Sequence, residues 1–400
     1  MKIKNPYIRN LKKEYFSFYD YPVKYTLKDY DSTLGKIRNI AKKTKEILSI
    51  YTFGEVGVPG VSDIDLIFVL KENSRLPSFL KKNQVDKDSK YLIFHPFFII
   101  TENIMKNINY IYPNSNFIKI YGKDIEIHNP SKSDLKKIKT YLTTDVILRH
   151  FPVDHLYNLL SRKIDIRMAL MRLNAFNHSF SIFKDITGKE KAIWKDFSKK
   201  IDYLRKNCFE MDKNLLQIKL LDALKESIYI STDFVKEFDK FLPKNKILKA
   251  KRKNVIFKGT KNRITFSENW DEDKAISEML NHFLRYKNFY SILPISLLNQ
   301  LCAYSSLNGR LSSYIRKRLN IKCFQNNMDP VLKKRIRILN DQVEYANELK
   351  HSHYPCFFPL GYKTEKGFKN NLILLFVVIT SSSAFRIMLY YLRGILRKNN

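Results

Sequence analysis

The order of polar and apolar positions divides the chain into two parts. In the first 130 residues, short apolar runs follow one segment with helical spacing, a pattern typical of a small mixed α/β domain. The helical spacing predicts a helix over residues 26–48, with Thr26 or Asp31 as its N-cap. The other elements expected in this part are strands at about 49–53, 63–70, 90–100 and 117–127 and a helix at 102–111.

Beyond Asn129-Pro130-Ser131 the pattern becomes predominantly helical. Helices are expected to start at Ser131 or Ser133 and then to occupy about 156–186, 190–208, 213–229 and 232–241. Residues 254–266 have the pattern of a hairpin that turns between Gly259 and Asn262, and Pro330–His351 has the pattern of a further helix. The predicted fold class is α/β plus α-helical, with domains at 1–130, 131–243 and 254–400.

A pair of carboxylates stands at the start of the apolar segment 63–70. Asp63 and Asp65 are separated by Ile64, and residues i and i+2 of a strand point to the same face. Two carboxylates so close repel each other unless a cation or a shared proton relieves them. Mg²⁺ held by one or two carboxylates plus substrate phosphates is a common solution. A plain hairpin with exposed acids is the alternative.

The segment before this pair is rich in glycine. Gly54, Gly57 and Gly60 remove Cβ atoms where the backbone must turn tightly, and Pro59 stiffens the loop. Such a loop can bring backbone N–H groups close to phosphate oxygens. The same glycine spacing also describes an ordinary surface turn, so the loop gains meaning only together with the two acids.

Phe53-Gly54, then eight residues, then Asp63-Ile64-Asp65 resemble the signature of the polymerase-beta-like nucleotidyltransferase superfamily. The resemblance covers roughly residues 25–130 and implies a small mixed β-sheet nucleotidyltransferase-like domain. It implies two Mg²⁺ ions held by Asp63 and Asp65, which would stabilise the entering and leaving oxygens of an in-line displacement. It also implies a nucleoside triphosphate docked on the loop that contains Gly54 and Glu55, with Ser62 ordering that loop.

The resemblance further implies a third acidic residue on a later strand, where the segment 90–100 holds His95. A neutral imidazole can accept a proton near neutral pH and can bind metals, so His95 is the expected third catalytic residue. A histidine packed under Pro96 is the alternative. Glu55 is a second departure, because the superfamily usually has Ser or Gly there. The acidic residues that could substitute for His95 are Asp86, Asp88, Asp124 and Glu126.

Three arginines recur every five residues along the expected helix 156–186. Arg162, Arg167 and Arg172 are ~140° apart from one to the next around a helix, so they form no single stripe. A solvated or ion-paired surface is the simplest interpretation. Helices after the sheet supply nucleotide contacts in the superfamily that the chain resembles, so a phosphate contact by one arginine is the alternative.

The chain has a net charge of +33, and residues 301–400 carry 17 basic side chains against 5 acidic ones. Residues 244–253 add six positive charges in ten positions. A coding bias towards lysine would explain this excess without any function, whereas nucleic acid or an anionic membrane surface would be attracted by it. The uncharged segment 370–385 is expected to form a buried helix, with a membrane-surface helix as the alternative.

The cysteines are Cys208, Cys302, Cys323 and Cys356, which lie far apart without paired spacing. Reduced thiols and a cytoplasmic location are therefore expected, with the membrane periphery as the alternative. The chain also opens without a secretory signal.

The predicted function is metal-dependent transfer of a nucleotidyl group from a nucleoside triphosphate to an unidentified hydroxyl acceptor. The alternative is a catalytically lapsed nucleotidyltransferase fold that serves as a basic scaffold for nucleic acid or membrane.

Overall fold

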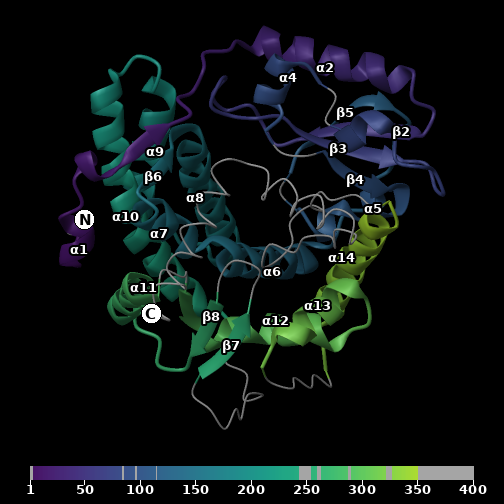
Figure 1. Ribbon diagram of the computed structural model, residues 1–400. Helices are drawn as coiled ribbons and strands as arrows, with labels where there is room; N and C mark the ends of the chain where they lie inside the picture. The colour runs from purple at the N-terminus through teal and green to yellow at the C-terminus, as the bar shows by residue number, and fades with distance from the viewer. Residues whose placement is uncertain are drawn as a thin grey trace, which may run out of the picture.

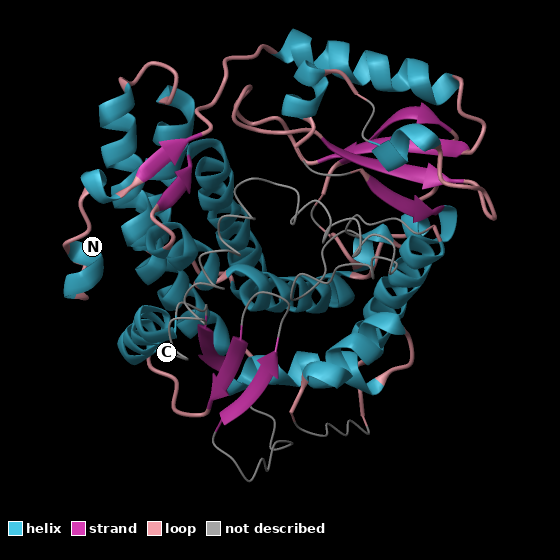
Figure 2. Cartoon of the chain, in the orientation of Figure 1, coloured by secondary structure: helices cyan, strands magenta, loops and turns pink. Residues whose placement is uncertain are grey.

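The computed structural model describes residues 3–82, 85–94, 97–113, 115–242, 254–258, 263–286, 290–320 and 327–349. Within these ranges the chain is mixed α/β and predominantly helical, with one four-stranded, one three-stranded and one two-stranded sheet (Figure 2). The four-stranded sheet lies in the first part of the chain and the helices dominate after it, as the hydrophobic pattern predicts.

The four-stranded sheet has the order β4-β3-β2-β5. Its strands are β2 (Ile47–Phe53), β3 (Asp65–Leu70), β4 (Phe98–Thr101) and β5 (Phe117–Gly122). β2 runs antiparallel to both β3 and β5, whereas β3 and β4 are parallel. The sheet is therefore mixed, as expected from the sequence.

The two faces of this sheet pack against different partners. α2 (Leu27–Lys42) and α4 (Lys87–Leu92) cover one face, while α6 (Lys132–His150) and α14 (Pro330–Glu348) lie on the other side (Figure 1). Alternate residues of β3 divide between the two cores. Ile64, Leu66 and Phe68 join the core under α2, and Ile67 and Val69 join the core that continues into the helices. This division follows from the two-residue period of a strand.

α2 begins close to its predicted start and ends before its predicted end. Asp29 accepts hydrogen bonds from both the backbone N–H and the hydroxyl of Thr26, which marks Thr26 rather than Asp31 as the N-cap. The helix ends at Lys42, earlier than the predicted residue 48, because Ile47 and Leu48 already belong to β2.

The prediction of a single strand over 90–100 is wrong in its first part. Residues up to Leu92 form α4, and only Phe98–Thr101 form β4. Asp86 caps α4 by accepting from the Ser89 N–H and hydroxyl, and this local signal outweighs the apolar run. The predicted helix 102–111 is split into α5 (Glu102–Lys106) and a 3₁₀ turn at Ile108–Tyr110.

The predicted strand 117–127 ends early, at Gly122. This glycine has φ +86° and lies so close to the neighbouring strand that a Cβ would come 2.1 Å from the Leu48 carbonyl oxygen. Asp124 and Glu126 therefore lie beyond the sheet and not within it.

The expected long helix 156–186 is interrupted. α7 (Val153–Leu160) and α8 (Ile166–Thr187) are separated by β6 (Lys163–Asp165), which pairs in parallel with β1 (Ser17–Tyr19). Arg162 has φ +58° between them, a conformation that ends a helix, and Asp165 caps α8 by accepting from the Met168 N–H.

The remaining helices follow the predictions more closely. α9 spans Ala192–Asn207, and the predicted helices 213–229 and 232–241 form one helix, α10 (Lys213–Asp239). The expected hairpin is present as β7 (Asn254–Lys258) and β8 (Arg263–Ser267), and β9 (Tyr290–Pro294) pairs in parallel with β8. The helices of the C-terminal part that the structure describes are α11 (Glu272–Tyr286), α12 (Leu298–Ser306), α13 (Arg310–Arg318) and α14.

Several predictions fall outside the described residues: the basic segment 244–253, the turn at 259–262 and the apolar segment 370–385. Among the helices that are described, none is both long enough and apolar enough to cross a bilayer.

Cys208 is a buried free thiol, whereas Cys302 takes part in a disulfide. The expectation of four reduced thiols therefore holds at Cys208 and fails at Cys302.

Candidate active site

Asp63 and Asp65 lie where β3, an inner strand of the four-stranded sheet, begins. Asp65 is the first residue of β3 and pairs with Phe53, the last residue of β2. Ile64 is buried in the core under α2, whereas both aspartates are half-buried. By strand alternation the Asp65 side chain turns away from α2, towards the side of the sheet where α6 and α14 lie (Figure 1). Asp63 lies two residues earlier, before the strand begins.

The two carboxylates influence each other electrostatically. The pKa of Asp65 is raised well above its ordinary value, first because its side chain is shielded from water and second because of the charge of Asp63. A carboxylate in this situation is stabilised by a nearby cation. The position of the pair suits a hard cation whose remaining ligands come from outside the protein.

Few of the described side chains near Asp63 and Asp65 could act as metal ligands. Across the residues that the structure describes, no group of three or more His, Cys, Asp or Glu side chains is placed to hold a metal ion. Asp63 and Asp65 would thus supply carboxylate oxygens, and phosphate oxygens or water the other ligands. That division fits Mg²⁺, which usually keeps several waters and binds through one or two carboxylates plus substrate phosphates.

His95, the expected third catalytic residue, lies outside the described residues, as does Pro96. The acidic substitutes do not reach the pair. Asp86 caps α4 and pairs with Lys36, and hydrogen bonds from Ser89 lower its pKa. Asp88 is exposed and accepts from the Tyr25 hydroxyl.

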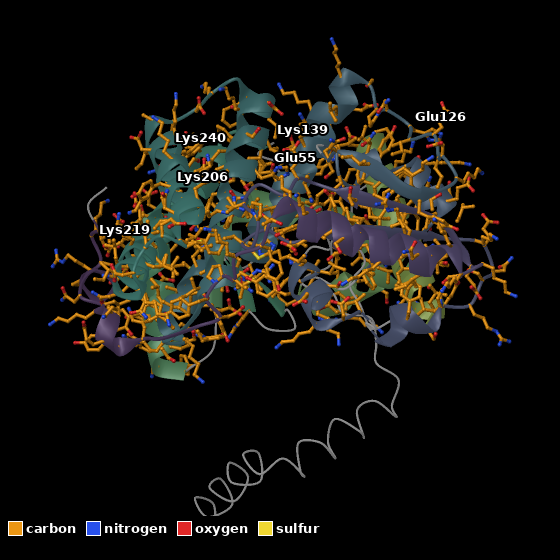
Figure 3. The ribbon with its side chains drawn as sticks, turned by 90° about the horizontal axis from the view of Figure 1, so that it is seen from above. Glu55, Glu126, Lys139, Lys206, Lys219 and Lys240 are labelled. Atoms are coloured by element: carbon orange, nitrogen blue, oxygen red, sulfur yellow. The ribbon has the colours of Figure 1, made fainter. Side chains whose placement is uncertain are left out.

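Asp124 and Glu126 lie beyond the end of the sheet that is opposite to Asp65. They follow Gly122, which pairs with Ser49, whereas Asp65 pairs with Phe53 four residues further along β2. Four strand residues correspond to about 13 Å. Figure 3 shows Glu126 at the outer edge of the molecule, away from Glu55. Neither acid can therefore serve as a third ligand to the same ion.

The loop from Gly54 to Ser62 connects β2 to the acid pair. Gly54 has φ +78° and is exposed with open space around its Cβ position, and Glu55 next to it is also exposed. Ser62 is buried, and its hydroxyl accepts from the Val58 N–H (3.1 Å) and from Arg205 Nη2 (3.0 Å). Ser62 thus fixes the loop from its buried side, whereas Gly54 and Glu55 are exposed to solvent.

Gly60 is the tightest point of the loop. It has φ +82°, and a Cβ there would come 2.1 Å from the Val23 carbonyl oxygen. Gly60→Ala is therefore expected to destabilise the fold by about 1–3 kcal/mol, measured as the free energy of unfolding in urea. Gly57→Ala is the matched control, since its Cβ would meet only side-chain atoms at 3.9 Å. Equal effects of the two changes would contradict the argument.

Two buried arginines from the helical part of the chain contact this loop. Arg205 on α9 reaches Ser62, and Arg167 on α8 donates to the backbone carbonyls of Val61, Ser62 and Tyr91. Arg167 is 2 % exposed, so the expectation of a solvated surface is wrong for this residue. Three of its five N–H donors are directed at these backbone carbonyls and not at a phosphate.

Sequence reasoning missed the roles of Arg205 and Tyr30. The Tyr30 hydroxyl donates to the Ser62 carbonyl at 2.6 Å and accepts from the Gly60 N–H at 2.9 Å. Nothing in the local pattern points to either residue. Each contacts the loop across a long sequence separation and is buried like an ordinary core side chain.

A cavity of about 550 Å³ lies at the opposite end of β3 from Asp65. Leu48, Leu70, Glu102 and Lys106 are among its lining residues. Glu102 there pairs with Lys106 and Lys123. The cavity is thus separate from the acid pair.

Comparisons of the whole chain with protein-family models, with curated proteins and with solved structures gave no match. The assignment of a function therefore depends on the geometry of the acid pair and its loop.

Proposed function

We propose that this chain is a metal-dependent nucleotidyltransferase that moves a nucleotidyl group from a nucleoside triphosphate to a hydroxyl acceptor. One observation carries the proposal: Asp63 and Asp65 flank a buried isoleucine at the start of β3, and each lies within reach of the other's charge. The mixed sheet, the glycine loop and the spacing of the acids agree with the nucleotidyltransferase-like signature.

In this proposal each part of the site has a defined task. Asp63 and Asp65 hold Mg²⁺, which when bound supplies charge stabilisation for the transferred phosphoryl group and its entering and leaving oxygens. The exposed backbone at Gly54 and Glu55 lies beside the triphosphate. Ser62 keeps the loop in place through its buried hydroxyl. The Glu55 carboxylate is exposed, so it can point away from phosphate.

Calorimetric titration with Mg²⁺ and each of the four ribonucleoside triphosphates tests this function. Binding of at least one triphosphate is expected, with loss of about tenfold or more in affinity in Asp63→Asn and in Asp65→Asn. Asp124→Asn is the matched control, because that carboxylate is exposed and paired with Lys119. Absence of triphosphate binding by the wild-type chain would refute the proposal.

Two observations favour a second function. The loop carries Glu55 where the superfamily usually has Ser or Gly, and the chain has a net charge of +33. A catalytically lapsed nucleotidyltransferase-like fold acting as a basic scaffold for RNA or anionic membrane would explain both. Salt-sensitive association with RNA or with anionic vesicles, without triphosphate binding, would favour this scaffold.

A further inference from the structure

We propose that Arg167 is a positioning residue for the acid pair, and that through it helix α8 controls cation binding at Asp63 and Asp65. This inference rests on the proposed function, since it assigns a role at the same site. It adds a residue that lies outside the sheet and about a hundred positions later in the chain. The guanidinium itself is directed at backbone carbonyls and not at the substrate.

The three residues before Asp63 have carbonyls that accept hydrogen bonds from side chains. The Gly60 carbonyl accepts from the Tyr91 hydroxyl (2.7 Å), and the Val61 carbonyl accepts from Arg167 Nε (3.2 Å). The Ser62 carbonyl accepts from the Tyr30 hydroxyl (2.6 Å) and from Arg167 Nη2 (3.4 Å). This stretch of backbone is therefore fixed by α2, α4 and α8, outside the strand ladder.

Arg167 also ties the acid pair to the end of α4. Its Nη1 donates to the Tyr91 carbonyl at 2.7 Å, and the Ile64 N–H donates to the next carbonyl, that of Leu92, at 2.8 Å. The carbonyls of the last helical turn lack partners within a helix, so these bonds satisfy groups that need them. The Arg167 guanidinium thus joins the loop before Asp63 to the end of α4. The end of α4 in turn binds the backbone N–H of Ile64, the residue between the two acids.

The shape of the guanidinium is essential to this arrangement. Arg167 is 2 % exposed, and its guanidinium carbon lies 3.8 Å from the centre of the Tyr91 ring. Three donors in a rigid plane reach three carbonyls at once, which the single ammonium of lysine cannot reproduce. Stacking on Tyr91 fixes the plane of the side chain.

The consequence concerns the two carboxylates. Repulsion favours a larger separation between them, and the fixed backbone on either side of Asp63 opposes it. A cation that needs both carboxylates would then find them already in place, which raises its affinity. If Arg167 is lost, we expect the loop to relax and the carboxylates to move apart.

Mn²⁺ is the probe, because its binding can be followed by electron paramagnetic resonance without any acceptor or turnover. Arg167→Lys is expected to weaken Mn²⁺ binding about tenfold or more. It should also change the line shape of the bound ion, and Arg167→Met should behave in the same way. Tyr30→Phe removes one hydrogen bond to the Ser62 carbonyl and should weaken binding severalfold. Hydrogen exchange of the amides from residue 60 to 65 should become faster in each variant.

Tyr304→Phe is the matched control. It also removes a buried phenol O–H, here the donor to the carboxylate of Asp145 on α6. Asp145 is not among the described residues that hydrogen-bond to the loop before Asp63. Its Mn²⁺ dissociation constant should equal that of the wild-type chain. Unchanged Mn²⁺ affinity and line shape in a folded Arg167 variant would overturn the positioning role alone. If neither Arg167 variant folds, unchanged affinity in Tyr30→Phe would overturn it. The proposed function and the positioning role would both be overturned if the wild-type chain bound no Mn²⁺. Equal Mn²⁺ affinities of the wild-type chain and Asp63→Asn would overturn them as well.

Discussion

Asp65→Asn is expected to lower the proposed nucleotidyl transfer strongly and, at the same time, to make the fold more stable at pH 7. Burial and the charge of Asp63 raise the pKa of Asp65 above its ordinary value of 3.8, so its ionisation costs more in the folded than in the unfolded chain. The amide removes that cost, and the expected gain in the free energy of unfolding is about 1 kcal/mol. Transfer should fall roughly a thousandfold, because metal stabilisation of a phosphoryl group is worth several kcal/mol.

The sign of this effect depends on pH. Below pH 3.8 the carboxyl is protonated in both states, so the wild-type chain and Asp65→Asn should be equally stable. The difference should appear as the pH rises from 3.8 through the raised pKa of the folded state, and it should then stay constant. Chemical denaturation at several pH values measures it, with Asp124→Asn as the control that shows no gain. A loss of stability at pH 7 in Asp65→Asn would show that the carboxylate stabilises the fold.

Arg335→Met is expected to have the largest effect on stability, a loss of about 3–5 kcal/mol in the free energy of unfolding. Arg335 on α14 is fully buried, and its Nη2 donates to the Asp145 carboxylate on α6 at 2.6 Å. Removal of the arginine leaves that carboxylate buried with only Tyr304 and Gln300 as donors. Urea denaturation of the two proteins measures the loss.

A double change and a surface control make this prediction specific. Asp145→Leu combined with Arg335→Met removes both charges and should recover much of the lost stability. Arg310→Met disrupts the pair with Glu344, whose side chains are 54 % and 40 % exposed, and should cost less than ~1 kcal/mol. A similar cost for Arg335→Met and Arg310→Met would mean that the buried pair contributes no more than the exposed one.

Elements with strong local signals could be predicted from the sequence. The apolar run 66–70 forms β3 almost where expected, because each face of this strand packs against a core. Pro330 at the first helical turn and Asp329 as N-cap mark the start of α14. The prediction that Asp63 and Asp65 share a face depends on strand alternation, and it stays a prediction because β3 begins only at Asp65.

Two failures in the helical part of the chain have a common cause, namely partners that are distant in sequence. Arg162 interrupts the expected long helix because the chain there pairs with Ser17–Tyr19, about 145 residues earlier. Arg167 is buried because it satisfies carbonyls of another part of the chain. Helical periodicity reports which face of a helix is apolar, and it contains no information about a charged side chain that is buried against backbone.

The contact between Arg167 and the loop before Asp63 spans 106 positions of the chain. On the ribosome, at about 5–20 residues per second, the segment that carries the two acids emerges roughly 5 to 20 s before this arginine does. β2 and β3 can pair during that interval, but the backbone before Asp63 lacks its hydrogen bonds from Arg167 until α8 has formed and docked. A nascent chain that has completed only its sheet should therefore bind divalent ions weakly, and the binding should strengthen once α8 has been added.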